Sequence, residues 1–160
     1  MNETTVRLKK ANAILKRGRV KDALSLYADI IEDDPENPLV YYNMGVAFIE
    51  KDDFDLARQV FQHCLKLGLE SDRVYIGLGI CYLKMKEYDQ AFNYFEKVTY
   101  RDESYNESLI GKVYTLVSKG EAERATPYLA ELKSNSVWNQ ELALVEKTVK
   151  MKSYYDSRKK

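Results

Sequence analysis

The chain has 160 residues, of which 45% are hydrophobic and 31% are charged, and its 25 Lys and Arg balance its 25 Asp and Glu. This composition is typical of one soluble folded domain and excludes a disordered chain. A net charge of zero argues against nucleic acid or an anionic membrane as the main partner. The N-terminus has no apolar signal sequence, and no window reaches the roughly 18 apolar residues of a membrane span. We therefore expect a cytoplasmic protein without membrane insertion.

One pattern of residues recurs at a constant spacing through the chain. Alanines recur every 34 residues, and a large apolar residue follows each of them four positions later. The alanines are Ala23, Ala57, Ala91 and Ala125, and the apolar residues are Tyr27, Phe61, Phe95 and Leu129. Upstream, Met44-Gly45 recurs as Leu78-Gly79. Positions 41, 44, 45 and 48 share one face of a helix, as do positions 57, 61 and 64, which predicts two amphipathic helices in each repeat.

This pattern resembles the tetratricopeptide repeat, a helix–turn–helix unit of about 34 residues. We place the repeats at about 4–37, 38–71, 72–105 and 106–139, a capping helix at about 140–156 and a basic tail at 157–160. Gly18, Asp52-Asp53, Lys86-Glu87 and Gly120 mark the turn inside each repeat. The resemblance implies an all-α fold, a right-handed superhelical solenoid of antiparallel helix pairs that forms a single domain over residues 1–160.

The C-terminal part departs from the repeat. Pro127 falls inside the expected second helix of the fourth repeat and predicts a kink, which is either a hinge or the mark of a degenerate terminal repeat. Leu142, Val145 and Val149 give the last helix an apolar stripe, as expected for a terminal cap with a polar outer face. Residues 140–160 hold six Lys and Arg against three Asp and Glu, which could bind an acidic surface or form a solvated tail.

Residues that could carry chemistry are few and poorly placed for catalysis. His63 is the only histidine, and its position is polar in the other repeats, so we expect it to face solvent. Cys64 and Cys81 occupy positions that are mostly apolar elsewhere, which predicts buried and unreactive thiols. The aspartates at 52–55 lie at a turn and a helix start, where carboxylates complement the helix dipole. We expect no catalysis, no cofactor and no metal site.

In the tetratricopeptide-repeat family, the first helix of each repeat lines the concave side of the superhelix. The resemblance therefore assigns a partner-binding groove to positions 2, 5, 6, 9 and 12 of the repeats, which are largely apolar in this chain. The residues selected are Leu8, Asn12, Tyr42, Asn43, Val46, Ile49, Arg73, Ile76, Ile80, Leu83, Ile110 and Tyr114. The apolar arc of the helix at 41–50 is also wider than one packing contact requires. Gly77 and Gly111 are expected to leave room for the backbone of a guest.

These features favour a non-catalytic scaffold whose groove holds a peptide or helix of another protein. In this interpretation Asn12, Asn43 and Arg73 orient the polar groups of the guest. The family also contains clamps for an acidic C-terminal carboxylate, but Leu8 and Gly77 replace two of the cations that such a clamp needs.

Two other hypotheses stay open. The chain could be a structural protein that self-associates, as a homo-oligomer, through its groove or its ends. It could also be a secretion chaperone, because residues 71–81 look somewhat like the translocator chaperones of type III secretion.

Overall fold

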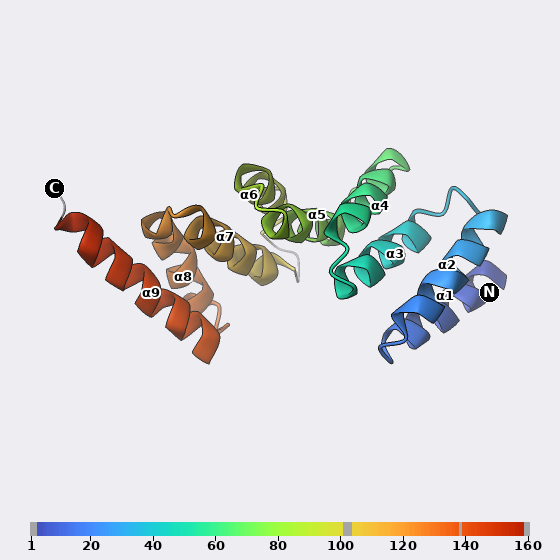
Figure 1. The fold of residues 1–160 in the computed structure, drawn as a ribbon, viewed down its shortest axis with the longest axis horizontal. Helices are drawn as coiled ribbons and strands as arrows, with labels where there is room; N and C mark the ends of the chain where they lie inside the picture. Colours follow the sequence, from blue (N-terminus) through green and yellow to red (C-terminus); the bar gives the residue numbers. More distant parts are fainter. Residues whose placement is uncertain (1–2, 101–103, 138, 159–160) are drawn as a thin grey trace.

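The computed structural model describes residues 3–100, 104–137 and 139–158. These residues form nine α-helices and one 3₁₀ helix, η1, without a strand. The elements are α1 (Glu3–Leu15), α2 (Val20–Asp33), α3 (Pro38–Glu50), α4 (Phe54–Lys66), α5 (Asp72–Lys84), α6 (Tyr88–Glu96), α7 (Tyr105–Lys119), η1 (Ala122–Ala125), α8 (Thr126–Ser134) and α9 (Gln140–Ser157). Figure 1 shows them side by side in an elongated array, with the two ends of the chain far apart. Residues 159 and 160 of the expected basic tail lie outside the described residues.

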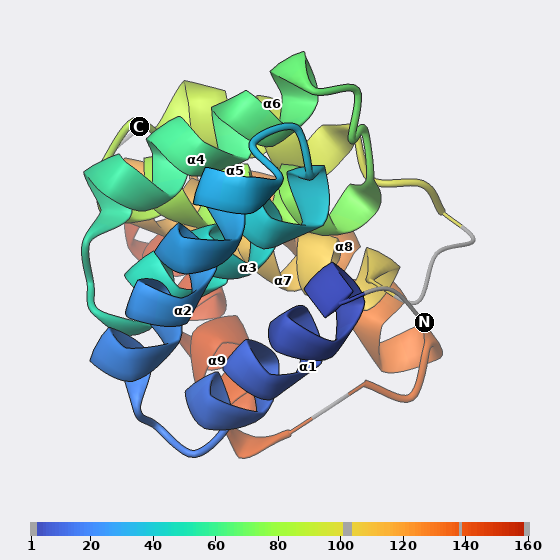
Figure 2. The same ribbon diagram turned by 90° about the vertical axis from the view of Figure 1, so that its right-hand side faces the viewer.

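The helices pack as antiparallel pairs that stack on one another. Through α7, each helix packs against the next helix in the chain, and α1, α3, α5 and α7 also contact one another in succession. Figure 2 looks along this stack from the end that carries α1 and α2. The all-α solenoid predicted from the sequence is therefore confirmed. Among the described residues, no helix is both long and apolar enough to span a membrane.

Two phenylalanine rings join the middle repeats. Phe61 of α4 is fully buried between Gly45 of α3 and Gly77 of α5, where a Cβ atom at either glycine would come within 2.6 Å of the ring. Phe95 of α6 lies in the same way against Gly79 of α5 and Gly111 of α7, where the corresponding distances are 2.6 and 2.4 Å. The rings thus occupy the space that was expected to admit a guest at Gly77 and Gly111. At Gly77 that expectation is wrong, since this glycine serves the packing between repeats, whereas Gly111 both packs on Phe95 and lines a cavity between α5 and α7.

The turn inside each repeat contains one residue with a left-handed backbone. These residues are Gly18 (φ 74°), Asp52 (φ 58°), Lys86 (φ 64°) and Gly120 (φ 94°), and they stand at the same position of the four repeats. Glycine adopts this conformation without a steric penalty, whereas a side chain makes it costly. The second and third repeats therefore form the same turn with Asp52 and Lys86, for which the left-handed conformation is less favourable than for glycine.

The fourth repeat ends differently from the others. Its second helix is split into η1 and α8, and Pro127 lies in the first turn of α8, where a missing backbone N–H costs little. The interruption predicted from Pro127 is therefore present. α9 then packs on η1 and α8 through Leu142 and Val149, which are both 2% exposed. The Lys152 ammonium also donates a hydrogen bond of 2.8 Å to the Gly120 carbonyl.

The outer face of α9 is less polar than expected for a cap. Leu144 is 66% exposed, Met151 is 53% exposed and Tyr154 is 51% exposed. Leu144 and Met151 follow Ile110 and Val117 of α7 by one repeat length, at positions 5 and 12 of the repeat. The apolar positions of the concave side are thus continued on the last helix.

Candidate functional site

A cavity of about 700 Å³ opens between α5 and α7. The two helices lie on the same side of the stack because the first helices of successive repeats contact one another. Five residues of the predicted groove line this cavity, namely Ile76, Ile80, Leu83, Ile110 and Tyr114. The Phe95 ring also reaches the cavity wall. An apolar cavity of this size can bury several side chains of a binding partner.

A smaller cavity of about 260 Å³ adjoins the first and is more polar. Its lining consists of Tyr42, Arg73, Ile76, Ser104 and Glu107, so that Ile76 and Glu107 belong to both cavities. Burial raises the pKa of the Tyr42 hydroxyl, and the nearby positive charge of Arg73 opposes this shift. We call the two cavities together the groove.

The remaining predicted groove residues line neither cavity. Leu8 packs against the core of the first repeat, and Val46 and Ile49 pack against the central core. The Asn12 side-chain oxygen accepts a 2.6 Å hydrogen bond from the Tyr27 hydroxyl. The Asn43 side-chain nitrogen donates a 2.7 Å hydrogen bond to the carbonyl of Leu39. Because these amide groups already serve the fold, they are poor candidates for orienting a guest.

Sequence reasoning missed several polar residues of the larger cavity. Glu107 and Glu141 follow Arg73 by one and two repeat lengths, so both stand at position 2 of the repeat and could have been selected by the same rule. Lys84 and Lys86 come from the end of α5 and the turn after it, outside the family positions that guided the selection.

The Tyr114 hydroxyl ties the groove to the last helix. It donates a hydrogen bond to the carboxylate of Glu141 at the start of α9. Burial and this carboxylate raise the pKa of Tyr114 to about 12, so the hydroxyl stays protonated at neutral pH. The contact connects the cavity wall to the cap helix.

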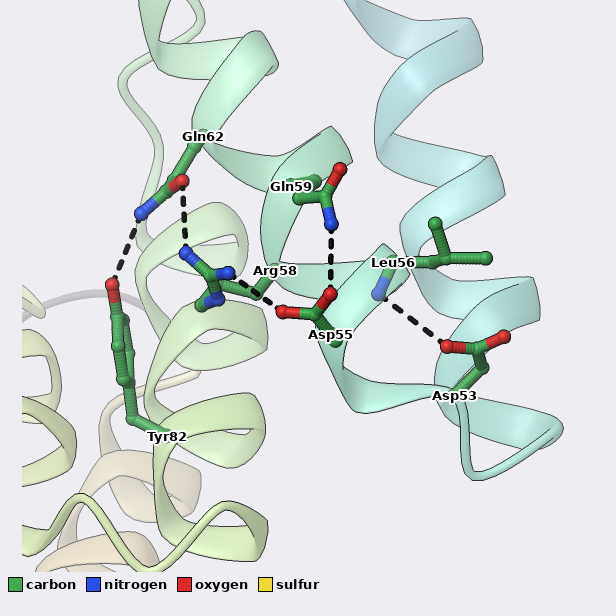
Figure 3. A network of polar contacts seen from close by, with 7 residues as sticks. All are labelled: Asp53, Asp55, Leu56, Arg58, Gln59, Gln62 and Tyr82. Carbon is green, nitrogen blue, oxygen red and sulfur yellow. Dashed lines mark hydrogen bonds and ion pairs between the residues drawn. The ribbon is translucent and has the colours of Figure 1, made fainter.

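The acidic residues at 53–55 belong to a structural network (Figure 3). The Asp53 carboxylate caps α4 by accepting a hydrogen bond from the backbone N–H of Leu56. The Asp55 carboxylate accepts hydrogen bonds from Arg58 and Gln59, and these bonds lower its pKa. The Arg58 guanidinium also donates to Gln62, which donates to the Tyr82 hydroxyl of α5 at 3.0 Å. The aspartates thus lie at the start of α4, as predicted from the sequence. The link from Asp55 through Arg58 and Gln62 to Tyr82 was not predicted, and it connects α4 with α5.

The thiols and the histidine offer no reactive centre. Cys64 and Cys81 are buried, and burial raises the pKa of each thiol to about 12. The His63 ring is half-buried and packs edge-on against Tyr41, with ring centroids 4.4 Å apart, so it faces solvent only in part. The described residues contain no group of His, Cys, Asp and Glu that could hold a metal ion.

Comparison with known proteins identifies the repeat. A family model described as tetratricopeptide repeat matches residues 38–104. No curated protein matches the chain.

Solved structures share the fold at low sequence identity. A tetratricopeptide repeat protein from Parabacteroides merdae ATCC 43184 superposes with a TM-score of 0.74 and 20% identity, over 98% of this chain and 61% of that one. A crystal structure of MamA gives a TM-score of 0.73 with 21% identity, over 86% of this chain and 82% of that one. MamA MSR-1 gives 0.71 with 22% identity, over 84% and 79%. At these identities the likeness concerns the fold alone.

Proposed function

We propose that this chain, which is a tetratricopeptide-repeat protein, is a non-catalytic scaffold that holds a segment of another protein in the groove between α5 and α7. The observation that supports this proposal most directly is the apolar cavity itself. Solvent-accessible apolar cavities with polar rims are typical of binding sites. The repeat fold is consistent with such a role, since it presents an extended concave surface.

Ile80 lies near the middle of the larger cavity. It stands on α5 between Ile76 and Leu83, and Tyr114 of α7 lines the same cavity. Side chains near the centre of an interface usually contribute most to affinity, because water is excluded around them. Ile80 is only partly buried in the free protein, so its outer part is available to a guest.

The substitution Ile80→Glu tests this assignment. A guest would bury the new carboxylate without a partner, which costs a few kcal/mol of binding free energy. We therefore expect affinity purification from the native source to recover specific partners with the wild-type chain and to lose them with the variant. The matched control is Leu56→Glu, which makes the same change at a 40% exposed residue of α4 that does not line the groove.

Circular dichroism and thermal melting separate binding from folding. The helical signal of Ile80→Glu should stay close to that of the wild type, because the side chain borders the cavity. If both variants recover the same proteins as the wild type, the groove assignment fails. If Ile80→Glu unfolds, Ile80 belongs to the core and the less disruptive Ile80→Ser replaces it in the same comparison.

A second candidate function is self-association through α9. Leu144, Met151 and Tyr154 form an exposed apolar stripe along this helix. Such a stripe at the end of a solenoid can be covered by a second copy of the chain. The third hypothesis, a secretion chaperone, stays a prediction.

A further inference from the structure

The two cavities lie end to end along α5. They share Ile76 and Glu107, and the smaller one begins at Arg73 near the start of the helix. The larger one ends at Lys84 and Lys86, where the helix stops. The step from Ile76 to Lys84 corresponds to roughly 12 Å of helix. A guest in the larger cavity thus spans about two helical turns or about four extended residues.

Lys84 and Lys86 place two positive charges at one end of the groove. Neither ammonium has a carboxylate within ion-pair distance among the described residues. The Lys84 ammonium instead lies 5.9 Å from the ring centroid of Phe54. The pairs at the same positions of the other repeats are Lys16 and Gly18, Glu50 and Asp52, and Ser118 and Gly120. Only the third repeat has lysine at both positions.

Lys86 occupies its position against a conformational preference. Its φ of 64° is in the left-handed region, and the first and fourth repeats place glycine there. Lysine is poorly suited to this region because its Cβ atom crowds the backbone. Asp52 has the same conformation in the second repeat, so the conformation belongs to the shared turn, and Lys86 differs from Asp52 by lining the larger cavity.

The opposite end of the groove is acidic or neutral. Glu107 lines both cavities there, and Arg73 offsets its charge within the smaller one. Glu141 adds a second carboxylate to the larger cavity, where it accepts the hydrogen bond of Tyr114 in the middle part of α7. A negatively charged group of a guest is therefore attracted to the Lys84 and Lys86 end and is repelled by Glu107 and Glu141.

We propose that the groove binds a short apolar segment of another protein that is flanked on one side by Asp or Glu side chains. The apolar side chains of this segment fill the cavity beside Ile80 and Ile110, and its carboxylates lie next to Lys84 and Lys86. This proposal rests on the proposed function of the groove and specifies which partner segment it accepts and in which direction.

A library of random peptides displayed on phage provides the probe. The peptides are fused through their C-termini, so that side chains are the only carboxylates they offer. The library is selected on the full chain, and enriched peptides are then synthesised with a fluorescent label. Their affinities are measured by fluorescence anisotropy for the wild type, for Lys84→Glu/Lys86→Glu and for Lys16→Glu/Lys21→Glu. The last variant makes the same change of net charge at exposed lysines of the first repeat, away from both cavities.

We expect enriched peptides to combine apolar residues with Asp or Glu on one side. Lys84→Glu/Lys86→Glu should weaken their binding by at least about tenfold, whereas Lys16→Glu/Lys21→Glu should change it by less than about twofold. Enrichment without acidic residues, or equal binding by both charge variants, would overturn the proposal. If the two lysines only complement the C-terminal dipole of α5, Lys84→Glu/Lys86→Glu has a lower melting temperature but binds the peptides as tightly as Lys16→Glu/Lys21→Glu does.

Ile80→Glu distinguishes failure of this proposal from failure of the groove itself. If selected peptides lose affinity for Ile80→Glu but not for Lys84→Glu/Lys86→Glu, the groove binds apolar segments without a preference for acidic ones. If neither variant loses affinity, or if no peptide is enriched, both the proposed function and this inference fail.

Discussion

Phe61 shows how side chains of neighbouring repeats fit together. Its ring extends from α4 and touches Gly45 in its own repeat and Gly77 in the next one. The sequence predicts the small residue at position 45, because a glycine recurs at the same position of the next repeat, at Gly79. It does not predict the role of Gly77, because periodicity alone cannot show that the ring of a preceding helix fills that space. Gly45 and Gly77 therefore serve the packing of one ring.

Replacing Gly77 by alanine tests this packing. In an ordinary helix, glycine to alanine stabilises by roughly 0.5–1 kcal/mol. At Gly77 the added Cβ atom would lie 2.6 Å from the enclosed Phe61 ring. We expect Gly77→Ala to lower the free energy of unfolding in urea by about 1–3 kcal/mol. The loss should shrink in a Phe61→Leu background, which gives a direct coupling energy. An unchanged or higher stability of Gly77→Ala would contradict this packing.

At the level of whole elements, the helices follow from the sequence better than their breaks do. Ala125, Leu129 and Leu132 keep the expected apolar spacing and are buried, although the backbone changes there from η1 to α8. The repeat pattern predicts which residues contact the core, but it does not distinguish an α-helix from a 3₁₀ helix at those positions. The proline supplied the missing information in this case, since its ring cannot fit into a helix interior.

The groove could be predicted only in part. Ile76, Ile80, Leu83, Ile110 and Tyr114 share a repeat position with other concave residues, and all five line the larger cavity. The sequence does not show how far apart successive first helices lie, so it cannot show that the cavities form at α5 and α7 while Val46 and Ile49 pack against the core. Lys84 and Lys86 were missed because they belong to a helix end and a turn.

α9 allows a direct test of self-association. Burying Leu144, Met151 and Tyr154 against a second copy would remove apolar area from water, which stabilises a dimer by about 25 cal/mol per Å² before other terms. We expect sedimentation velocity to show a concentration-dependent rise in mass for the wild type, and a lower association constant for Met151→Glu. Glu141→Gln at the same helix keeps the stripe and serves as the control. A wild type that stays monomeric at every concentration would remove this candidate.

At the scale of the whole molecule, the core is divided. The buried apolar residues of the described part of the chain form three clusters, one in the first repeat and α3, one in the middle repeats and one in the fourth repeat with α9. Each end cluster has a neighbour on one side only, whereas the central cluster is covered on both sides. In stacked repeats, stability depends on the intrinsic stability of each unit and on its neighbours. The central cluster should therefore open last.

Cys64 and Cys81 report directly on this opening. They lie in the central cluster, on α4 and α5, and burial raises the pKa of each thiol to about 12. Both folded thiols are therefore protonated at pH 8, and burial shields both of them from reagents. We expect a disulfide reagent such as DTNB to label them only through unfolding, with an opening free energy equal to that measured in urea.

Hydrogen exchange and the pH dependence of stability test independently whether the central repeats open last. Backbone amides of α1 and α9 should exchange through smaller openings than those of α4 and α5.

Because the folded thiols have the higher pKa, their contribution to stability is complete below the unfolded pKa near 8.5 and declines as the pH rises toward 12. The control for the DTNB experiment is a cysteine introduced by Ser134→Cys at an exposed position, which gives the labelling rate of an accessible thiol. Native labelling of Cys64 or Cys81 at that rate would show that the central repeats open locally and that the ends do not limit the stability of the stack.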